Sequence, residues 1–287
     1  MHDSSQPGFS VIGHTDGRSP LVFASPHSGR AYPSAFLAAA RLSEAQLRRA
    51  EDALVDELLE NVDCAPVMLA HYARTFLDLN RAADEIDPDM FAGPLTVPTR
   101  ITDRVNAGLG ALPRLATHGQ AIYSRKLDPL DAVSRINSLH RPWHDRIAVL
   151  IDRARSRHGY AVLVDCHSMP TPAGTRPPQI VVGDRYGNSA APALVALVER
   201  HFASQGWRVA RNAPFAGGHT TEFHGDVRAG VHAIQIEIDR GLYIDSVTLA
   251  RHSGFGQVAA AMAGLARLLV GATPILGLGP QLREAAE

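Results

Sequence analysis

Two histidines in this sequence stand at the ends of apolar runs, where a metal ion could be held. His27 ends LVFASPH (21–27), and His167 ends AVLVDCH (161–167). Short apolar runs bounded by turn residues are typical of buried strands, and the carboxyl ends of parallel strands meet at one edge of a sheet. Imidazole nitrogens brought together there suit two ligands of Zn²⁺. Because the chain has 14 histidines, two hydrogen-bonded structural histidines are the alternative interpretation.

A third metal ligand is harder to choose from the sequence. Catalytic zinc sites usually take three protein ligands. The segment 43–62 predicts one helix, opened by the capping-box pair Ser43 and Gln46. Asp52 and Asp56 are four residues apart in it, so one helix face would carry both carboxylates. By pattern alone, two solvated carboxylates on the outer face of this helix are the simpler interpretation.

A carboxylate also interrupts the apolar run HAIQIEID at 232–239. Alternation places Gln235, Glu237 and Asp239 on one face of the predicted strand. A buried carboxylate is costly unless it is paired or functional. Near a metal, Glu237 could act as a general base toward water. An ion pair with Arg240 is the structural alternative.

Candidate anion-binding residues follow another apolar stretch in the motif LDLNR (77–81). A guanidinium offers two parallel donors to a carboxylate, and an asparagine amide adds a third donor, so Asn80 and Arg81 could bind an acidic substrate. Arg74 and Arg176 are further candidates. The alternative is that all these arginines are surface charges and that Asn80 forms a turn.

The elements that must position these side chains alternate along the chain. Strands are predicted at 21–27, 65–72, 161–167, 179–184, 207–212 and 232–239, and helices at 43–62, 130–159, 189–206 and 257–278. Helices between buried strands indicate an α/β sheet that is covered on both faces. The sequence contains no repeat or linker, so we expect one domain over residues 1–287.

Composition and missing motifs exclude several functions. The formal net charge of −1 favours neither nucleic acid nor a membrane surface, and we expect neither partner. Two cysteines form no disulfide framework, and no signal peptide or 18-residue apolar span is present, so we expect a cytoplasmic protein. The sequence lacks a G-x-S-x-G elbow, a P-loop and a G-x-G-x-x-G fingerprint.

Seven motifs, taken in order, resemble the N-formylglutamate amidohydrolase (N-formylglutamate deformylase) family over about residues 8–265. They are SPHSGRAYP, the helix with Asp52 and Asp56, LDLNR, VDCHSMP, PPQIVVGDRYG, PFAGGHTTEFHG and QIEIDRGLY. The resemblance implies a three-layer α/β/α fold with a mixed, mostly parallel central sheet. This fold is similar to that of zinc carboxypeptidases and aspartoacylases, also described as phosphorylase/hydrolase-like.

The resemblance also implies a set of metal ligands. His27 and His167 look like the two metal histidines, and Zn²⁺ or another divalent transition metal is the expected cofactor. The broader carboxypeptidase pattern H-x-x-E fails here, because Arg30 stands three residues after His27. The family pattern therefore points to the helix aspartates, and Asp52 matches the more constant position better than Asp56 does.

The remaining roles follow from the same resemblance. Glu237 matches the catalytic glutamate, and Asn80 and Arg81 match the pair that grips a substrate carboxylate. From the chemistry of the reaction, we expect Arg176 to hold a glutamate carboxylate together with Arg81, and Arg74 to donate to the oxyanion. The implied reaction is hydrolysis of N-formyl-L-glutamate to formate and L-glutamate, the last step of one route of histidine breakdown.

Two other functions stay open at this point. The same residues would serve a metal-dependent amidohydrolase that acts on another N-acyl amino acid or a small peptide, because only the acyl pocket would differ. A metal-free binding protein on a hydrolase scaffold is the second alternative. The native metal and the oligomeric state are not indicated by the sequence.

Overall fold

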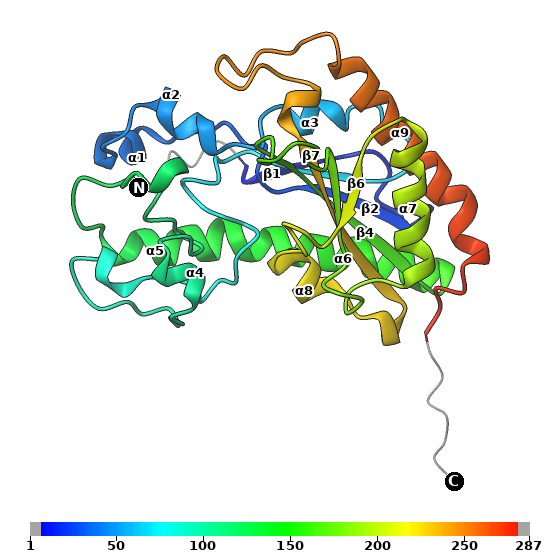
Figure 1. Ribbon diagram of the computed structural model, residues 1–287. Coiled ribbons are helices and arrows are strands. Elements are labelled where there is room, and N and C mark those ends of the chain that lie inside the picture. The colour runs from blue at the N-terminus through cyan, green and yellow to red at the C-terminus, as the bar shows by residue number, and fades with distance from the viewer. Residues whose placement is uncertain (1–6, 281–287) are drawn as a thin grey trace. The chain divides into compact units, whose positions relative to one another are not determined.

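The centre of the fold, in a computed structural model that describes residues 7–280, is a seven-stranded sheet (Figure 1). The strand order is β1-β3-β2-β4-β7-β5-β6. The strands are β1 Phe9–Ile12, β2 Leu21–Ser25, β3 Val67–Ala70, β4 Ala161–Met169, β5 Ile180–Gly183, β6 Val209–Arg211 and β7 Val231–Asp239. The six predicted strands are confirmed. The sequence missed β1, whose four residues are all half-buried at the sheet edge and form no fully apolar run.

The sheet is mixed and mostly parallel, which confirms the predicted fold class. Strand β4 pairs in parallel with β2 and β7, and β6 pairs in parallel with β5, whereas β5 runs antiparallel to β7. Every residue of β2, β4, β5 and β7 is buried. Strands that are covered on both faces need continuous apolar runs, which explains why the sequence signal was strong for these four.

The chain divides into two compact units. Of the described residues, one unit contains 7–10, 26–53 and 69–146, and the other contains 11–25, 54–68 and 147–280. That the two units together form one domain over residues 1–287 stays a prediction.

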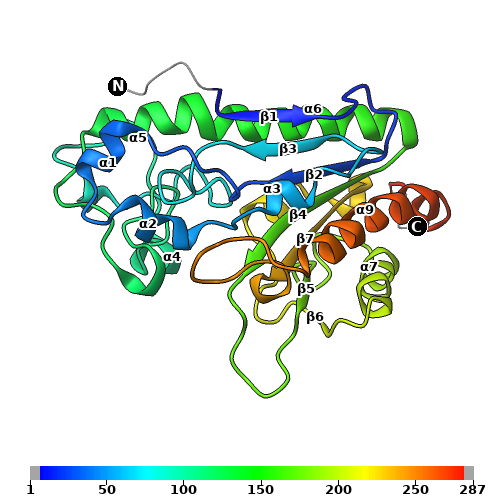
Figure 2. The ribbon, with the colours of Figure 1, turned by 90° about the horizontal axis from the view of Figure 1, so that it is seen from above.

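Long helices cover both faces of the sheet in the second unit. Helix α7 (Pro192–Ser204) packs against β5 and β6, and helix α9 (Phe255–Ala272) packs against β2 and against α7. Figure 2 shows α7 and α9 side by side. The opposite face carries α8 (His219–His224), which packs against β4 and β7, and the second half of α6 (Arg141–His158) (Figure 1).

Helix α9 and the following turn, Phe255–Ile275, are long and apolar enough to cross a membrane by length and composition alone. Half of the apolar window is buried inside the protein, and α9 also packs against the short helix α3 (Val55–Leu58). The sequence predicts a helix packed on the core over residues 257–278. Helix α9 is such a helix.

The first unit consists mainly of short helices and loops. Its helical elements are α1 Ser34–Ala39, α2 Glu44–Leu47, the 3₁₀ turn Arg48–Ala50, α4 Asp103–Asn106, α5 Pro129–Arg135, the π-helical turn Ile136–His140 and the start of α6. The predicted helix 130–159 is thus present, but a π-helical turn interrupts it. Such turns occur often at functional sites.

The prediction of one continuous helix over residues 43–62 is wrong. The capping box of Ser43 and Gln46 does open α2, but the helical segment ends at Ala50 and α3 begins only at Val55. Between them Leu54 adopts a left-handed backbone with φ of 62°. Asp52 and Asp56 therefore do not share a helix face.

Candidate metal centre

His27 is held in a buried turn directly after β2. Only Pro26 separates it from the last strand residue, and its side chain is buried. The turn continues through Gly29, where an added Cβ would lie 2.3 Å from the carbonyl oxygen of Tyr72, so only glycine fits. Nε2 of His27 lies 2.7 Å from Oδ1 of Asp78. A carboxylate accepts a hydrogen bond from Nε2–H, which leaves Nδ1 as the nitrogen that can bind an ion.

Asp78 is a buried residue beside His27 that no sequence pattern singled out, although it lies within the motif LDLNR. Its carboxylate accepts hydrogen bonds from the backbone N–H of Asn80 and from Arg74 Nη2, both at 2.9 Å. Burial raises the pKa of Asp78, but interactions with His27, Arg74 and Arg81, among them the hydrogen bond from His27, outweigh burial and hold the pKa well below its usual value. Asp78 is therefore an anion that orients His27.

Asp52 lies beside His27 because the backbone holds it there. The Asp52 N–H donates to the carbonyl oxygen of His27 at 3.0 Å, in the break between the two short helices. Asp52 Oδ2 lies 3.4 Å from His27 Nδ1, and Arg74 Nη1 lies 3.7 Å from Asp52 Oδ1. Two ligand atoms at about 2.0–2.2 Å from one tetrahedral zinc ion would be separated by roughly this distance.

His167 has the same arrangement on β4. Its Nε2 lies 2.9 Å from Oδ2 of Asp165, which is two residues earlier on the same face of the strand. Both side chains are buried. As with His27, the aspartate orients the ring so that Nδ1 is the nitrogen that can bind an ion.

Strand register explains why the two histidines can serve one ion. Strand β2 pairs with β4 so that Ala24 is opposite Asp165, and His27 and His167 follow these residues by three and two positions. The ligand atoms of His27, Asp52 and His167 all lie within 4.8 Å of one another, and all three side chains are buried. Two imidazoles oriented by carboxylates and a third ligand oxygen fit a divalent transition metal. The structure does not identify which metal.

Glu237 lies next to His167 in the sheet. The two residues are register partners on β4 and β7, and Glu237 is buried. Its Oε1 accepts a hydrogen bond of 2.8 Å from the amide of Gln235. Arg240, the ion-pair partner considered in the sequence, donates from its Nε to the hydroxyl of Ser168 at 3.0 Å.

The candidate substrate-binding loop combines a buried Asn80 with a half-buried Arg81. Arg81 donates from Nε to the carbonyl oxygen of Leu109 and from Nη1 to that of Asn80, at 2.9 and 2.8 Å. Burial lowers the pKa of Arg81. Within residues 7–280, Arg81 forms no ion pair with a carboxylate. A half-buried guanidinium that is not in direct contact with a carboxylate is a suitable partner for a substrate carboxylate.

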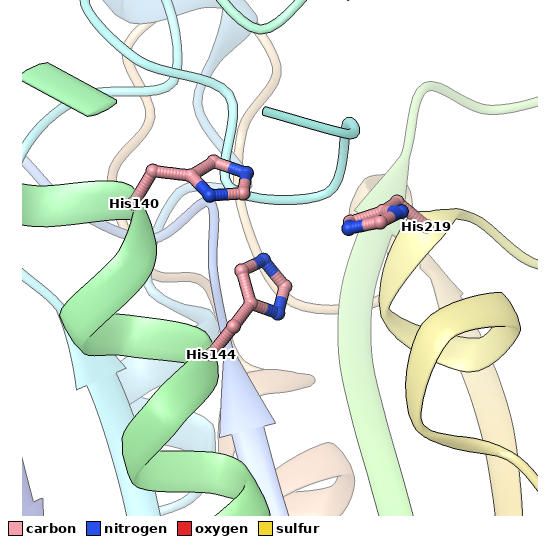
Figure 3. Close-up of side chains that lie close together, drawn as sticks. All are labelled: His140, His144 and His219. Carbon is pink, nitrogen blue, oxygen red and sulfur yellow. The ribbon is translucent and has the colours of Figure 1, made fainter. Parts of the chain in front are cut away.

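Two histidines at the π-helical turn support this loop. His140 and His144 lie one turn apart with ring centroids 4.6 Å from each other (Figure 3). Nε2 of His140 donates to the carbonyl oxygen of Arg81 at 2.8 Å, and Nε2 of His144 donates to that of Leu79 at 2.9 Å. Burial lowers the pKa of His140, so its neutral form is favoured. No pattern in the sequence connects this pair with residues 79–81.

The other candidates occupy different surroundings. Arg74 is half-buried against Asp78 and Asp52. Arg176 is exposed in the loop between β4 and β5. Asp56 is half-buried on α3 and is not part of the buried group of His27, Asp52 and His167.

A mixed, mostly parallel α/β sheet with a buried histidine–aspartate group next to its strand ends defines an α/β protein with a candidate metal site. Residues 19–244 match the sequence profile of the family described as N-formylglutamate amidohydrolase. The chain belongs to the N-formylglutamate amidohydrolase family.

Individual relatives agree with this assignment. The chain is 30% identical over 245 residues to an N-formylglutamate deformylase of Pseudomonas aeruginosa, which covers 82% of this chain and 86% of the relative. It is 28% identical over 257 residues to an N-formylglutamate deformylase of Pseudomonas putida, with 82% and 85% covered. The crystal structure of N-formylglutamate amidohydrolase from Ralstonia eutropha JMP134 superposes with a TM-score of 0.86 at 32% identity, covering 93% of this chain and 98% of the other.

Proposed function

We propose that the protein hydrolyses N-formyl-L-glutamate to formate and L-glutamate at a site where His27, Asp52 and His167 hold Zn²⁺. The observation that carries this proposal is the buried group of these three residues, in which an aspartate orients each histidine. The names of the two Pseudomonas relatives support the substrate. As in those relatives' names, the reaction is a deformylation, and we place it at the end of a route of histidine breakdown.

The metal would contribute Lewis acidity. When bound, a divalent ion acts as a Lewis acid on the scissile carbonyl and makes water more acidic. The protein must therefore keep its own ligands deprotonated and oriented. Asp78 and Asp165 do this by accepting the Nε2–H of His27 and His167, which keeps each Nδ1 in its ligand form.

Glu237 would transfer the protons of the reaction. As a carboxylate next to His167 on the adjacent strand, it can take a proton from the attacking water on a side-chain oxygen and deliver it to the leaving amine. Replacing Glu237 by Gln keeps the shape of the side chain and removes the basic oxygen. Near-normal turnover of that variant with metal still bound would contradict this role.

The arginines would bind the acidic substrate. Arg81 and Asn80 are the proposed partners of one glutamate carboxylate, because Arg81 is half-buried and forms no ion pair with a carboxylate within residues 7–280. Arg176 is the proposed partner of the second carboxylate. Arg74 beside Asp52 is the proposed donor to the negative charge that develops on the carbonyl oxygen.

A substrate panel tests the proposed function. Purified, zinc-loaded protein would be given the formyl, acetyl and formimidoyl derivatives of L-glutamate, and release of L-glutamate would be followed for each. We expect the highest kcat/KM for the formyl derivative. Preference for the acetyl derivative would show an amidohydrolase of another N-acyl amino acid, and no release from any of the three would overturn the proposed function.

A further inference from the structure

Four polar residues form a regular buried array on β4 and β7. Asp165 and His167 alternate on one strand, Gln235 and Glu237 alternate on the next, and the register places Asp165 opposite Gln235 and His167 opposite Glu237. All four side chains are buried in strands that are otherwise mainly apolar. In each strand the earlier residue contacts the later one, as a hydrogen-bonded pair two positions apart.

The contact within β7 has a defined direction. Gln235 Nε2 lies 2.8 Å from Glu237 Oε1. A carboxylate can only accept a hydrogen bond, so the amide must present its N–H groups to Glu237, and its carbonyl oxygen points elsewhere. The donated hydrogen bond therefore fixes the position of Oε1 of Glu237.

We propose that Gln235 is a positioning residue that holds the carboxylate of Glu237 in its working orientation, as Asp165 holds His167. This inference rests on the proposed function, because it gives Gln235 a role only through Glu237.

The chemistry of the array explains why an amide stands at position 235. Asp165 and Glu237 already place two carboxylates among these four buried side chains. A third carboxylate at position 235 would face both of them, and like charges in a buried site repel strongly. An apolar side chain would remove the hydrogen bond to Oε1 of Glu237. A neutral amide donates a hydrogen bond without adding charge.

A double-mutant cycle on thermal unfolding tests the contact itself. The variants are Gln235→Met, Glu237→Met and both together, measured on the full-length protein. Because the two side chains interact, we expect the melting temperature of the double variant to fall by less than the sum of the two single falls. The matched control is Ser189→Ala, which removes the buried hydrogen bond of 2.7 Å from Ser189 to the Ala233 carbonyl oxygen on the same strand. Its effect should add to that of Glu237→Met.

Steady-state kinetics of the zinc-loaded enzyme test the consequence of the contact. We expect Gln235→Met to lower kcat by about 10- to 100-fold with little change in KM and with full metal content. In the Glu237→Met background, the same substitution should leave the residual rate unchanged, because the group that it positions is gone. Ser189→Ala should keep the wild-type kcat.

The outcomes separate this inference from the proposed function. Additive melting temperatures, a normal kcat for Gln235→Met, or an equal loss of kcat in both backgrounds would each overturn the role of Gln235. Wild-type protein that hydrolyses none of the three glutamate derivatives would overturn the proposed function, and the unfolding cycle alone would then decide whether the two residues are coupled.

Discussion

Asp78 Oδ1 lies 2.7 Å from Nε2 of His27, and the same carboxylate accepts a hydrogen bond from Arg74. The pair connects the end of β2 with the loop that carries Asn80 and Arg81. Because Asp78 fixes the tautomer and the orientation of His27, the nitrogen proposed to bind the metal depends on a residue outside the proposed set of ligands.

Substitution of Asp78 by Asn should weaken metal binding. The variant keeps the side-chain shape but loses the negative charge that holds the Nε2–H of His27. We expect the affinity for Zn²⁺ to fall by about 10- to 100-fold. Competition with a chromogenic chelator measures this. Asp16→Asn is the matched control, because Asp16 forms an exposed ion pair with Arg18. Equal zinc affinity of Asp78→Asn and wild type would contradict the role of Asp78.

Substitution of Asp52 should lower the metal content of the protein, whereas substitution of Asp56 should not. Asp52 lies 3.4 Å from His27 Nδ1, whereas Asp56 is half-buried on α3 outside the buried group. After purification in zinc-containing buffer, elemental analysis should find less than one zinc per chain in Asp52→Asn and one zinc per chain in Asp56→Asn. The reverse result would make Asp56 the acidic ligand.

Stability should decrease as the pH falls, because a buried histidine resists protonation. Burial, together with the charge of His219, lowers the pKa of His224 to about 3 from 6.5. Between these values the unfolded chain binds a proton and the folded chain does not, so protonation favours unfolding. This histidine alone should remove about 2 kcal/mol of unfolding free energy between pH 7 and pH 5. Urea unfolding at several pH values should show a smaller pH dependence for His224→Gln, and an unchanged dependence would contradict the lowered pKa.

A buried arginine stabilises the first unit. Arg135 Nη1 donates to the carbonyl oxygen of Phe76 at 3.0 Å and to the hydroxyl of Tyr123 at 2.9 Å, and its guanidinium lies 4.0 Å from the ring centroid of Phe76. Lysine cannot form this planar, multiply bonded arrangement. We expect Arg135→Lys to lower the unfolding free energy by about 1.5–3 kcal/mol, as measured by urea denaturation. The exposed Arg141→Lys is the control, and equal stability of both variants would contradict the structural role.

The features that the sequence predicted are those set by local pattern. The strand runs that end near His27, His167 and Glu237 were found because buried strands need continuous apolar residues. The break between α2 and α3 was not found, because it depends on the Asp52 N–H donating to the distant carbonyl oxygen of His27. Asp78 was missed for a similar reason. Its partnership with His27 exists only in the folded chain, and the sequence does not distinguish it from the other acidic residues.

The most direct test of the central claim is formate release from N-formyl-L-glutamate by the purified protein, before chelation, after chelation and after Zn²⁺ is restored. The proposed site predicts that release stops when the ion is removed from His27, Asp52 and His167, and that it returns with stoichiometric zinc. Formate release that continues at full rate in metal-free protein would contradict the metal centre, and no release from fully zinc-loaded protein would contradict the proposed substrate.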